Sequence, residues 1–422
     1  MITDKKFIEG QLNTSRIKNN ILPLLLGVTP LFSIIFDEKW VPYFIGAIVI
    51  AYFLEPNKKE NVKHNSKLIV PFALMVLVFI LFTLVSSNIL LSLKVLERQV
   101  SLILLPFIVF ATNWNNARMI FFLKAFVFAL SVFCLYSFGH LIWFYFTSKN
   151  WIEIMNLTQD NSTYLLFKFP HLVNTHPTYW SYLLVIANLI VLSDVFYKFF
   201  RQQYVVVFLW LIFNTTLILL AARTPLTINI VAHLLLFGIY QKSRKDRAYK
   251  IRALLLLFSF IVTGLILVPR ISFLSEKFSD ALQDERFYLW PIALQQIKEN
   301  FFVLGEGLGM GSVVLKEYII EYGDIRQHYN SFDLHNQYLL HYLEMGILGL
   351  FALVGLIVYP IVKIRKIIFN PGSFLSIGLV LLVAFACFTE SPMYRLRGII
   401  IVSIFYSTFL VSSKMLKSKS CD

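Results

Sequence analysis

The chain has 422 residues, of which 58% are hydrophobic and only 15% are charged. A soluble domain usually carries about 25% charged residues, so one water-soluble core cannot bury this much apolar matter, and lipid must be the solvent for much of it. The formal net charge of +14 would suit a nucleic-acid-binding protein or a membrane protein with basic loops, and the positions of the charges decide between them.

Apolar segments near the length of a membrane span recur along the chain. They predict an all-α, polytopic bundle of about twelve transmembrane helices. The runs at Trp40–Leu54 and Val100–Thr112 are the shortest, and an error in either would change the count. The predicted spans are Ile21–Phe36, Trp40–Leu54, Leu68–Ser86, Val100–Thr112, Met119–Phe146, Tyr179–Tyr197, Tyr204–Ala221, Thr224–Tyr240, Ala253–Val268, Leu339–Val362, Phe374–Phe388 and Gly398–Ser412.

Basic residues concentrate in every second loop, which predicts that these loops face the cytoplasm. Both chain ends belong to that basic side, so the net charge follows from topology and requires no nucleic acid. The first apolar run begins after a polar stretch and does not have the form of a cleavable signal peptide. The three cysteines are far apart and have neither a disulfide-framework pattern nor metal-ligand spacing.

The chain is expected to form one membrane domain, residues 1–422, with two long external segments. One is the loop at residues 148–178, and the larger is the loop at residues 269–334. In the larger loop an amphipathic helix is predicted over Trp290–Asn300, with Pro291 in its first turn. Glycines follow at 305, 307, 309 and 311, a spacing that would let the backbone approach a ligand closely.

Ionisable residues at membrane depth are costly and therefore candidates for function. Arg223 lies between two apolar runs, where it could line an external cavity or extend to the membrane surface as a structural residue. Arg286 precedes the amphipathic helix, where a solvated loop charge is the ordinary interpretation. His176 enters the span after the first long loop, and Glu390 follows a late span on the same side.

His335 is the strongest candidate for proton transfer. Asp333 is expected to cap the next long helix, which would place His335 in its first turn. The positive end of the helix dipole would disfavour protonation, leaving a neutral imidazole that can act as a general base. The alternative is a histidine that only forms hydrogen bonds within the loop.

Three motifs in order resemble bacterial O-antigen ligases and O-antigen polymerases. The block from His335-Asn336-Gln337-Tyr338 to the glycines at 346 and 349 resembles the end of that family's large periplasmic loop. Arg223-Thr224-Pro225-Leu226 resembles its arginine turn. Arg286 to Trp290, followed by Gly305-Glu306-Gly307-Leu308-Gly309, resembles its loop helix.

The resemblance implies a glycosyltransferase of the bacterial inner membrane that uses an undecaprenyl-diphosphate-linked glycan without a metal or other cofactor. A ligase would transfer the glycan to a lipid acceptor such as lipid A–core, and a polymerase to another lipid-linked repeat. By this resemblance Arg223 and Arg286 would bind the diphosphate and His335 would be the base. His176 and Glu390 would contact the sugar or the acceptor.

Two other classes of protein remain open at this point. A transporter or flippase of a lipid-linked solute would also have about twelve spans, but it predicts paired repeats and charges in the middle of helices. A non-catalytic sensor or assembly subunit has no need of arginines and a histidine converging on one face. The sequence favours an external reaction site, because its candidate residues lie at helix ends and in one large loop.

Overall fold

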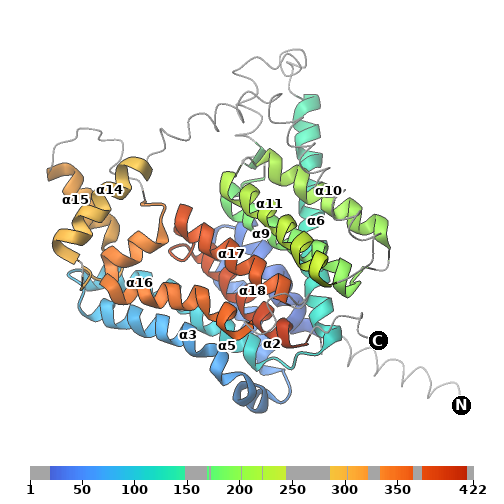
Figure 1. Ribbon diagram of the computed structural model, residues 1–422, viewed down its shortest axis with the longest axis horizontal. Coiled ribbons are helices and arrows are strands. Elements are labelled where there is room, and N and C mark those ends of the chain that lie inside the picture. Colours follow the sequence, from blue (N-terminus) through green and yellow to red (C-terminus); the bar gives the residue numbers. More distant parts are fainter. Residues whose placement is uncertain are drawn as a thin grey trace, which may run out of the picture.

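The computed structural model describes residues 20–147, 169–170, 173–200, 202–220, 222–243, 286–301, 303–321, 333–364 and 373–415. Every regular element in these ranges is helical, which confirms the predicted all-α class (Figure 1). The predicted span Ala253–Val268 and most of the loop at 148–178 lie outside the described residues, as do residues 269–285 and 322–332 of the larger loop.

The helices follow the apolar runs closely, because each run buries one face against its neighbours. The first helix is Asn20–Ile35, and a short 3₁₀ turn, Glu38–Trp40, precedes the second. The others are α2 (Val41–Phe53), α3 (Lys58–Leu84), α4 (Ile89–Gln99), α5 (Ser101–Ala111), α6 (Asn116–Thr147), α9 (Pro177–Tyr197), α10 (Gln203–Leu219), α11 (Arg223–Ser243), α14 (Arg286–Gln296), α15 (Gly311–Glu321), α16 (Gln337–Ile364), α17 (Phe374–Thr389) and α18 (Leu396–Met415).

Three helices in the described ranges are long and apolar enough to cross a membrane. They are α3, the segment Asn116–Phe144 of α6 and the segment Gln337–Lys363 of α16. Four shorter apolar helices accompany them: Asn20–Ile35, α10, α17 and Leu396–Ser412. These helices support an integral membrane protein, while the count of twelve stays a prediction.

The weakest predicted span, Val100–Thr112, is the short helix α5. Its 11 residues are too few to cross a bilayer unaided, but α4 leads into it with only Val100 between them. Eight α5 residues are buried, and the helix packs against α3 and α18. Helix α5 is thus an interior element of the bundle.

Loops predicted to share a side of the membrane meet at the same end of the molecule. At the predicted external end, Arg397 Nε lies 4.0 Å from Glu38 Oε1, and Leu308 N donates to the Phe82 carbonyl at 3.1 Å. At the other end the Tyr359 hydroxyl donates to the Lys67 carbonyl. In Figure 1, α14 and α15 lie together beside the first part of α16.

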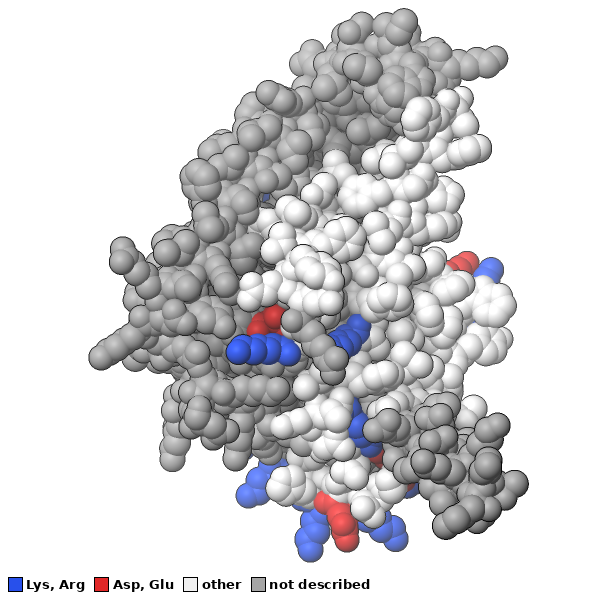
Figure 2. Space-filling view, turned by 90° about the vertical axis from the view of Figure 1, so that its right-hand side faces the viewer, with Lys and Arg blue, Asp and Glu red and all other residues white. Residues whose placement is uncertain are grey.

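Arg118, near the start of α6, is buried. Its guanidinium makes a two-pronged ion pair with the carboxylate of Glu55, with Nη2 2.9 Å from Oε2, and both side chains are buried. Buried charges are retained only when paired in this way, so this pair fastens two loops of the predicted cytoplasmic end. Figure 2 shows several charged side chains gathered at the lower end of one face, with a few others about halfway up and at the right edge of a mostly white surface.

The amphipathic helix of the large loop begins earlier than predicted. Helix α14 starts at Arg286, so Pro291 lies inside it rather than in its first turn, and the π-helical segment Ile297–Phe301 continues it. Its apolar face is buried against α15 and the start of α16, in a cluster formed by Leu289, Ala293, Ile297, Leu315, Ile319, Leu334, Leu340 and Leu343. Leu294, on the same helix, lies outside this cluster and is 53% exposed.

The glycine run docks on another part of the chain rather than standing open to a ligand. Helix α16 is broken at Gly346, where φ is 57° and ψ is −154°. The break removes the helical donors for the carbonyls of Leu343 and Glu344, and those carbonyls accept from Glu306 N at 3.1 Å and Gly307 N at 2.9 Å. A Cβ on Gly305 would lie 2.2 Å from the Glu344–Met345 backbone, so glycine is needed for this close approach.

Candidate active site

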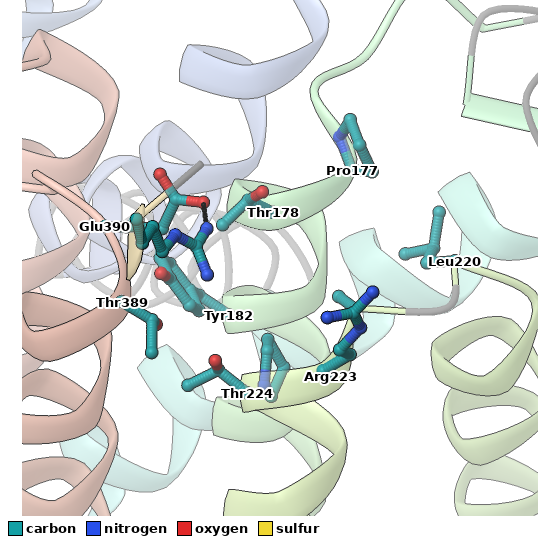
Figure 3. A pocket seen from close by; sticks show the side chains of 11 residues that line it. Pro177, Thr178, Tyr182, Leu220, Arg223, Thr224, Thr389 and Glu390 are labelled. Atoms are coloured by element: carbon teal, nitrogen blue, oxygen red, sulfur yellow. Dashed lines mark hydrogen bonds and ion pairs between the residues drawn. The ribbon is translucent and has the colours of Figure 1, made fainter. Parts of the chain in front are cut away.

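A pocket of about 160 Å³ opens where the ends of four helices meet the large loop. Figure 3 shows Pro177 and Thr178 at the start of α9, Leu220 at the end of α10 and Glu390 at the end of α17, around one space. The complete lining is Pro177, Thr178, Tyr182, Leu220, Ala222, Arg223, Thr224, Pro225, Arg286, Thr389 and Glu390. The pocket thus combines two guanidinium groups, one carboxylate and four hydroxyls.

Both predicted arginines line this pocket, although they lie far apart in the sequence. Arg223 is the first residue of α11 and Arg286 is the first residue of α14. The chain between α10 and α11 is only three residues long, so Arg223 is held at the helix end and cannot extend away on a loop. The planar fork of a guanidinium suits bidentate binding of phosphate oxygens.

Glu390 links Arg286 to His335. Its Oε1 accepts from Arg286 Nη2 at 3.2 Å, and its Oε2 lies 2.8 Å from His335 Nδ1. The carboxylate therefore orients the imidazole with Nδ1 as donor, which leaves Nε2 as the nitrogen able to accept a proton. Glu390 was a lesser candidate in the sequence, and the structure places it at the centre of the site.

Two local predictions about His335 are wrong. Asn336 caps α16, because its Oδ1 accepts from Tyr338 N at 3.0 Å and Leu339 N at 3.1 Å. Asp333 instead accepts a hydrogen bond from the Ser391 hydroxyl. His335 precedes the helix, with a left-handed φ of 48°, and its Nδ1 lies 2.8 Å from Glu390 Oε2.

The expected electrostatic effect on His335 is also reversed. The hydrogen bond that His335 donates to Glu390 raises the pKa of His335 above its ordinary value, and this effect outweighs the lowering caused by partial burial. Asp333 adds to the rise and Arg286 opposes it. A directly bonded carboxylate is a stronger influence than a helix dipole, which is screened and falls off within one turn.

His176 lies at the N-terminal boundary of α9, as predicted, but it does not line the pocket. Partial burial lowers the pKa of its imidazole, while Glu390 opposes this effect. It borders the pocket through its neighbour Pro177. His341, in the first part of α16, is 2% exposed, and its Nδ1 lies 2.9 Å from Gln337 Nε2.

Sequence reasoning missed the hydroxyl groups of the pocket. Thr178, Tyr182, Thr224 and Thr389 come from the ends of three different helices, and nothing in the sequence brings those ends together. The adjacency of Thr224 to Arg223 and of Thr389 to Glu390 was the only available signal. Among the residues that the structure describes, no group of three histidine, cysteine or acidic side chains could hold a metal ion.

Comparison with known proteins agrees with this geometry. Residues 206–354 match the family model described as O-antigen ligase, a segment that includes Arg223, Arg286 and His335, while Glu390 lies beyond it. No curated protein matches the chain. The structure is that of a helical membrane protein with an arginine-lined pocket, and its central segment is similar to the O-antigen ligase family.

Proposed function

We propose that this protein is a glycosyltransferase that moves a glycan from an undecaprenyl-diphosphate carrier to a hydroxyl of an acceptor such as lipid A–core. The observation that carries the proposal is the convergence of Arg223 and Arg286 on one pocket whose carboxylate, Glu390, also holds His335. The donor's leaving group is a diphosphate, and two guanidinium groups match its charge and geometry.

The positions of these groups support the following reaction. An acceptor hydroxyl attacks the anomeric carbon of the glycan, a new carbon–oxygen bond forms, and the bond from that carbon to the phosphate oxygen breaks. The electron pair leaves with undecaprenyl diphosphate, whose negative charge the arginines stabilise. The hydroxyl proton passes to His335 Nε2, and Glu390 stabilises the resulting imidazolium.

In this mechanism the arginines supply the positive charge that a metal ion would otherwise provide. Transfer is therefore expected to continue at its normal rate in the presence of a chelator. The topology predicted from the basic loops would put the pocket on the periplasmic side of the inner membrane, with both termini in the cytoplasm. A lipid-linked donor would present its diphosphate at this depth.

A polymerase would use the same site, with another lipid-linked repeat as the acceptor. The lipopolysaccharide of a deletion strain separates the two activities. We expect free core together with accumulated lipid-linked polymer, which is the result for a ligase. Core carrying a single repeat would instead identify a polymerase, and an unchanged ladder would contradict both.

A further inference from the structure

The carboxylate of Glu390 can act only if its backbone is held in place, and Glu390 lies in the short segment between α17 and α18. We call residues 390–393 the acidic turn. Local backbone bonds join Glu390 N to the Ala386 carbonyl at 2.8 Å and Tyr394 N to the Ser391 carbonyl at 3.0 Å. Neither bond involves Met393, whose backbone groups are bonded to other elements.

Two buried glutamines provide such bonds. Gln99 is the last residue of α4, and its Nε2 donates to the Met393 carbonyl at 2.7 Å. Gln337 is the first residue of α16, and its Oε1 accepts from Met393 N at 2.8 Å while its backbone N donates to the Glu390 carbonyl at 3.2 Å. Both peptide groups of Met393 are thus held by glutamine side chains.

Burial makes these bonds specific. Gln99 is 2% exposed and Gln337 is 0% exposed, so an amide there that lost its partner would have no water to replace it, at a cost of about 1–3 kcal/mol. The second amide group of Gln337 is also used, because its Nε2 donates to His341 Nδ1. Its orientation is therefore fixed from both sides.

We propose that Gln99 and Gln337 are positioning residues that hold the acidic turn so that Glu390 engages His335. The proposal rests on the function proposed for this site, but it concerns the geometry of the His335–Glu390 pair and can be measured without any turnover. Helix α4, which contributes nothing to the pocket lining, thereby acts on the site through Gln99.

The test is a titration of His335 by NMR in the full-length protein with labelled histidines, with the signal assigned by its loss in His335→Ala. Glu390, Asp333 and Arg286 act on the charge of this imidazole, and His176 is a further titratable group that interacts with it. Glu390→Gln gives the reference shift towards lower pKa. Gln337→Met and Gln99→Met preserve side-chain length but remove the amides, and we expect each to produce most of that shift.

The matched control is Asn65→Leu, which removes another buried amide-to-carbonyl bond, Asn65 Nδ2 to Phe110 O at 3.0 Å, between α3 and α5. It should leave the titration of His335 at the wild-type value. The proposal is overturned if folded Gln99→Met and Gln337→Met titrate like wild type. If only one of the two variants folds, the titration of His335 in that variant decides the question. If neither folds, Gln99→Asn, whose shorter side chain cannot reach the Met393 carbonyl as well, is titrated in their place.

A transfer assay on the same samples separates this proposal from the proposed function. If the wild type transfers no glycan, the function is wrong while the titration still reports on the two glutamines. If the wild type is active, the glutamine variants should lower kcat more than they raise the KM for donor, because the arginines that bind the donor are untouched. If the glutamine variants are only less stable than the wild type and His335 titrates as in the wild type, the glutamines have a purely structural role, and this result would contradict the proposal.

Discussion

Glu390 should shift the pH dependence of the site relative to that of an isolated histidine, because it is hydrogen-bonded to His335. In the proposed mechanism His335 accepts a proton only when it is neutral, so the rate should fall as the pH drops through the pKa of His335. Because Glu390 raises that pKa above its ordinary value of 6.5, half-maximal activity is expected above pH 6.5. Glu390→Gln removes the raising influence, and the acidic limb of the pH–rate profile should move to lower pH.

Glu38→Gln is the control for this profile, since Glu38 lies near Arg397 at the same end of the molecule and outside the pocket. Its acidic limb should match the wild type. An acidic limb that stays in place in Glu390→Gln, or that moves to higher pH, would show that the carboxylate does not govern His335.

The guanidinium fork of Arg223 should matter more than its charge. Arg223→Lys keeps the charge but loses the second donor of a bidentate contact with phosphate. We expect about a tenfold or greater loss in donor affinity, because a charge-assisted hydrogen bond is worth about 1.5–3 kcal/mol. Equilibrium binding of the lipid-linked donor measures this effect. Arg395→Lys, at an exposed position outside the pocket, should bind normally, and normal binding by Arg223→Lys would remove this arginine from the donor site.

The sequence singled out residues of the pocket where a charged residue stands in an apolar stretch. Arg223 and Arg286 stand out in apolar surroundings, and the pocket contains both. The role of Glu390 was underestimated because its partners lie 55 and 104 residues away. The cap of α16 was assigned to Asp333 although Asn336 is equally suited to the role, and the error moved His335 into a helical turn that it precedes.

At the scale of elements, the broken helix α16 and the glycine run stabilise each other. Gly346 has a backbone conformation that other residues adopt at a cost of about 1–3 kcal/mol, and its Cβ would lie 2.2 Å from the Val303 carbonyl. Gly346→Ala should therefore lower the midpoint of thermal unfolding in detergent by several degrees. Gly355→Ala, in the same helix with no atom within 4 Å of its Cβ, should leave the midpoint unchanged or raise it slightly. Equal midpoints for both variants would mean that the break is not needed.

The glycine run also shows where sequence reasoning at this scale reaches its limit. Alternating glycines predict a close backbone approach, and that part of the interpretation is correct. What they approach is a helix break some forty residues further on, which hydropathy does not reveal, because α16 reads as one continuous apolar segment. Similarly, α5 is apolar enough to resemble a span. Its helix has only 11 residues, and its packing against α3 and α18 shows that it is an interior element.

For the whole molecule, the alternation of basic loops predicts which residues face each side of the membrane. Glu317 on α15 and Lys59 at the start of α3 are both exposed, and the topology puts them on opposite sides. In a background without cysteines, Glu317→Cys should react with a membrane-impermeant thiol reagent in intact cells whose outer membrane has been opened. Lys59→Cys should react only after the inner membrane is broken. Equal labelling of both positions would overturn the topology.

The central claim is that His335 takes the proton during glycan transfer, and a single-turnover assay tests it most directly. Purified protein is mixed with an undecaprenyl-diphosphate-linked glycan and acceptor, and donor binding is measured in parallel. His64, exposed on α3 at the opposite end, provides the control, because His341 is buried against Gln337 and unsuitable. We expect His64→Ala to transfer normally and His335→Ala to transfer about 10²–10⁴-fold more slowly with donor binding intact. Transfer at the normal rate by His335→Ala, or loss of donor binding in that variant, would contradict the claim.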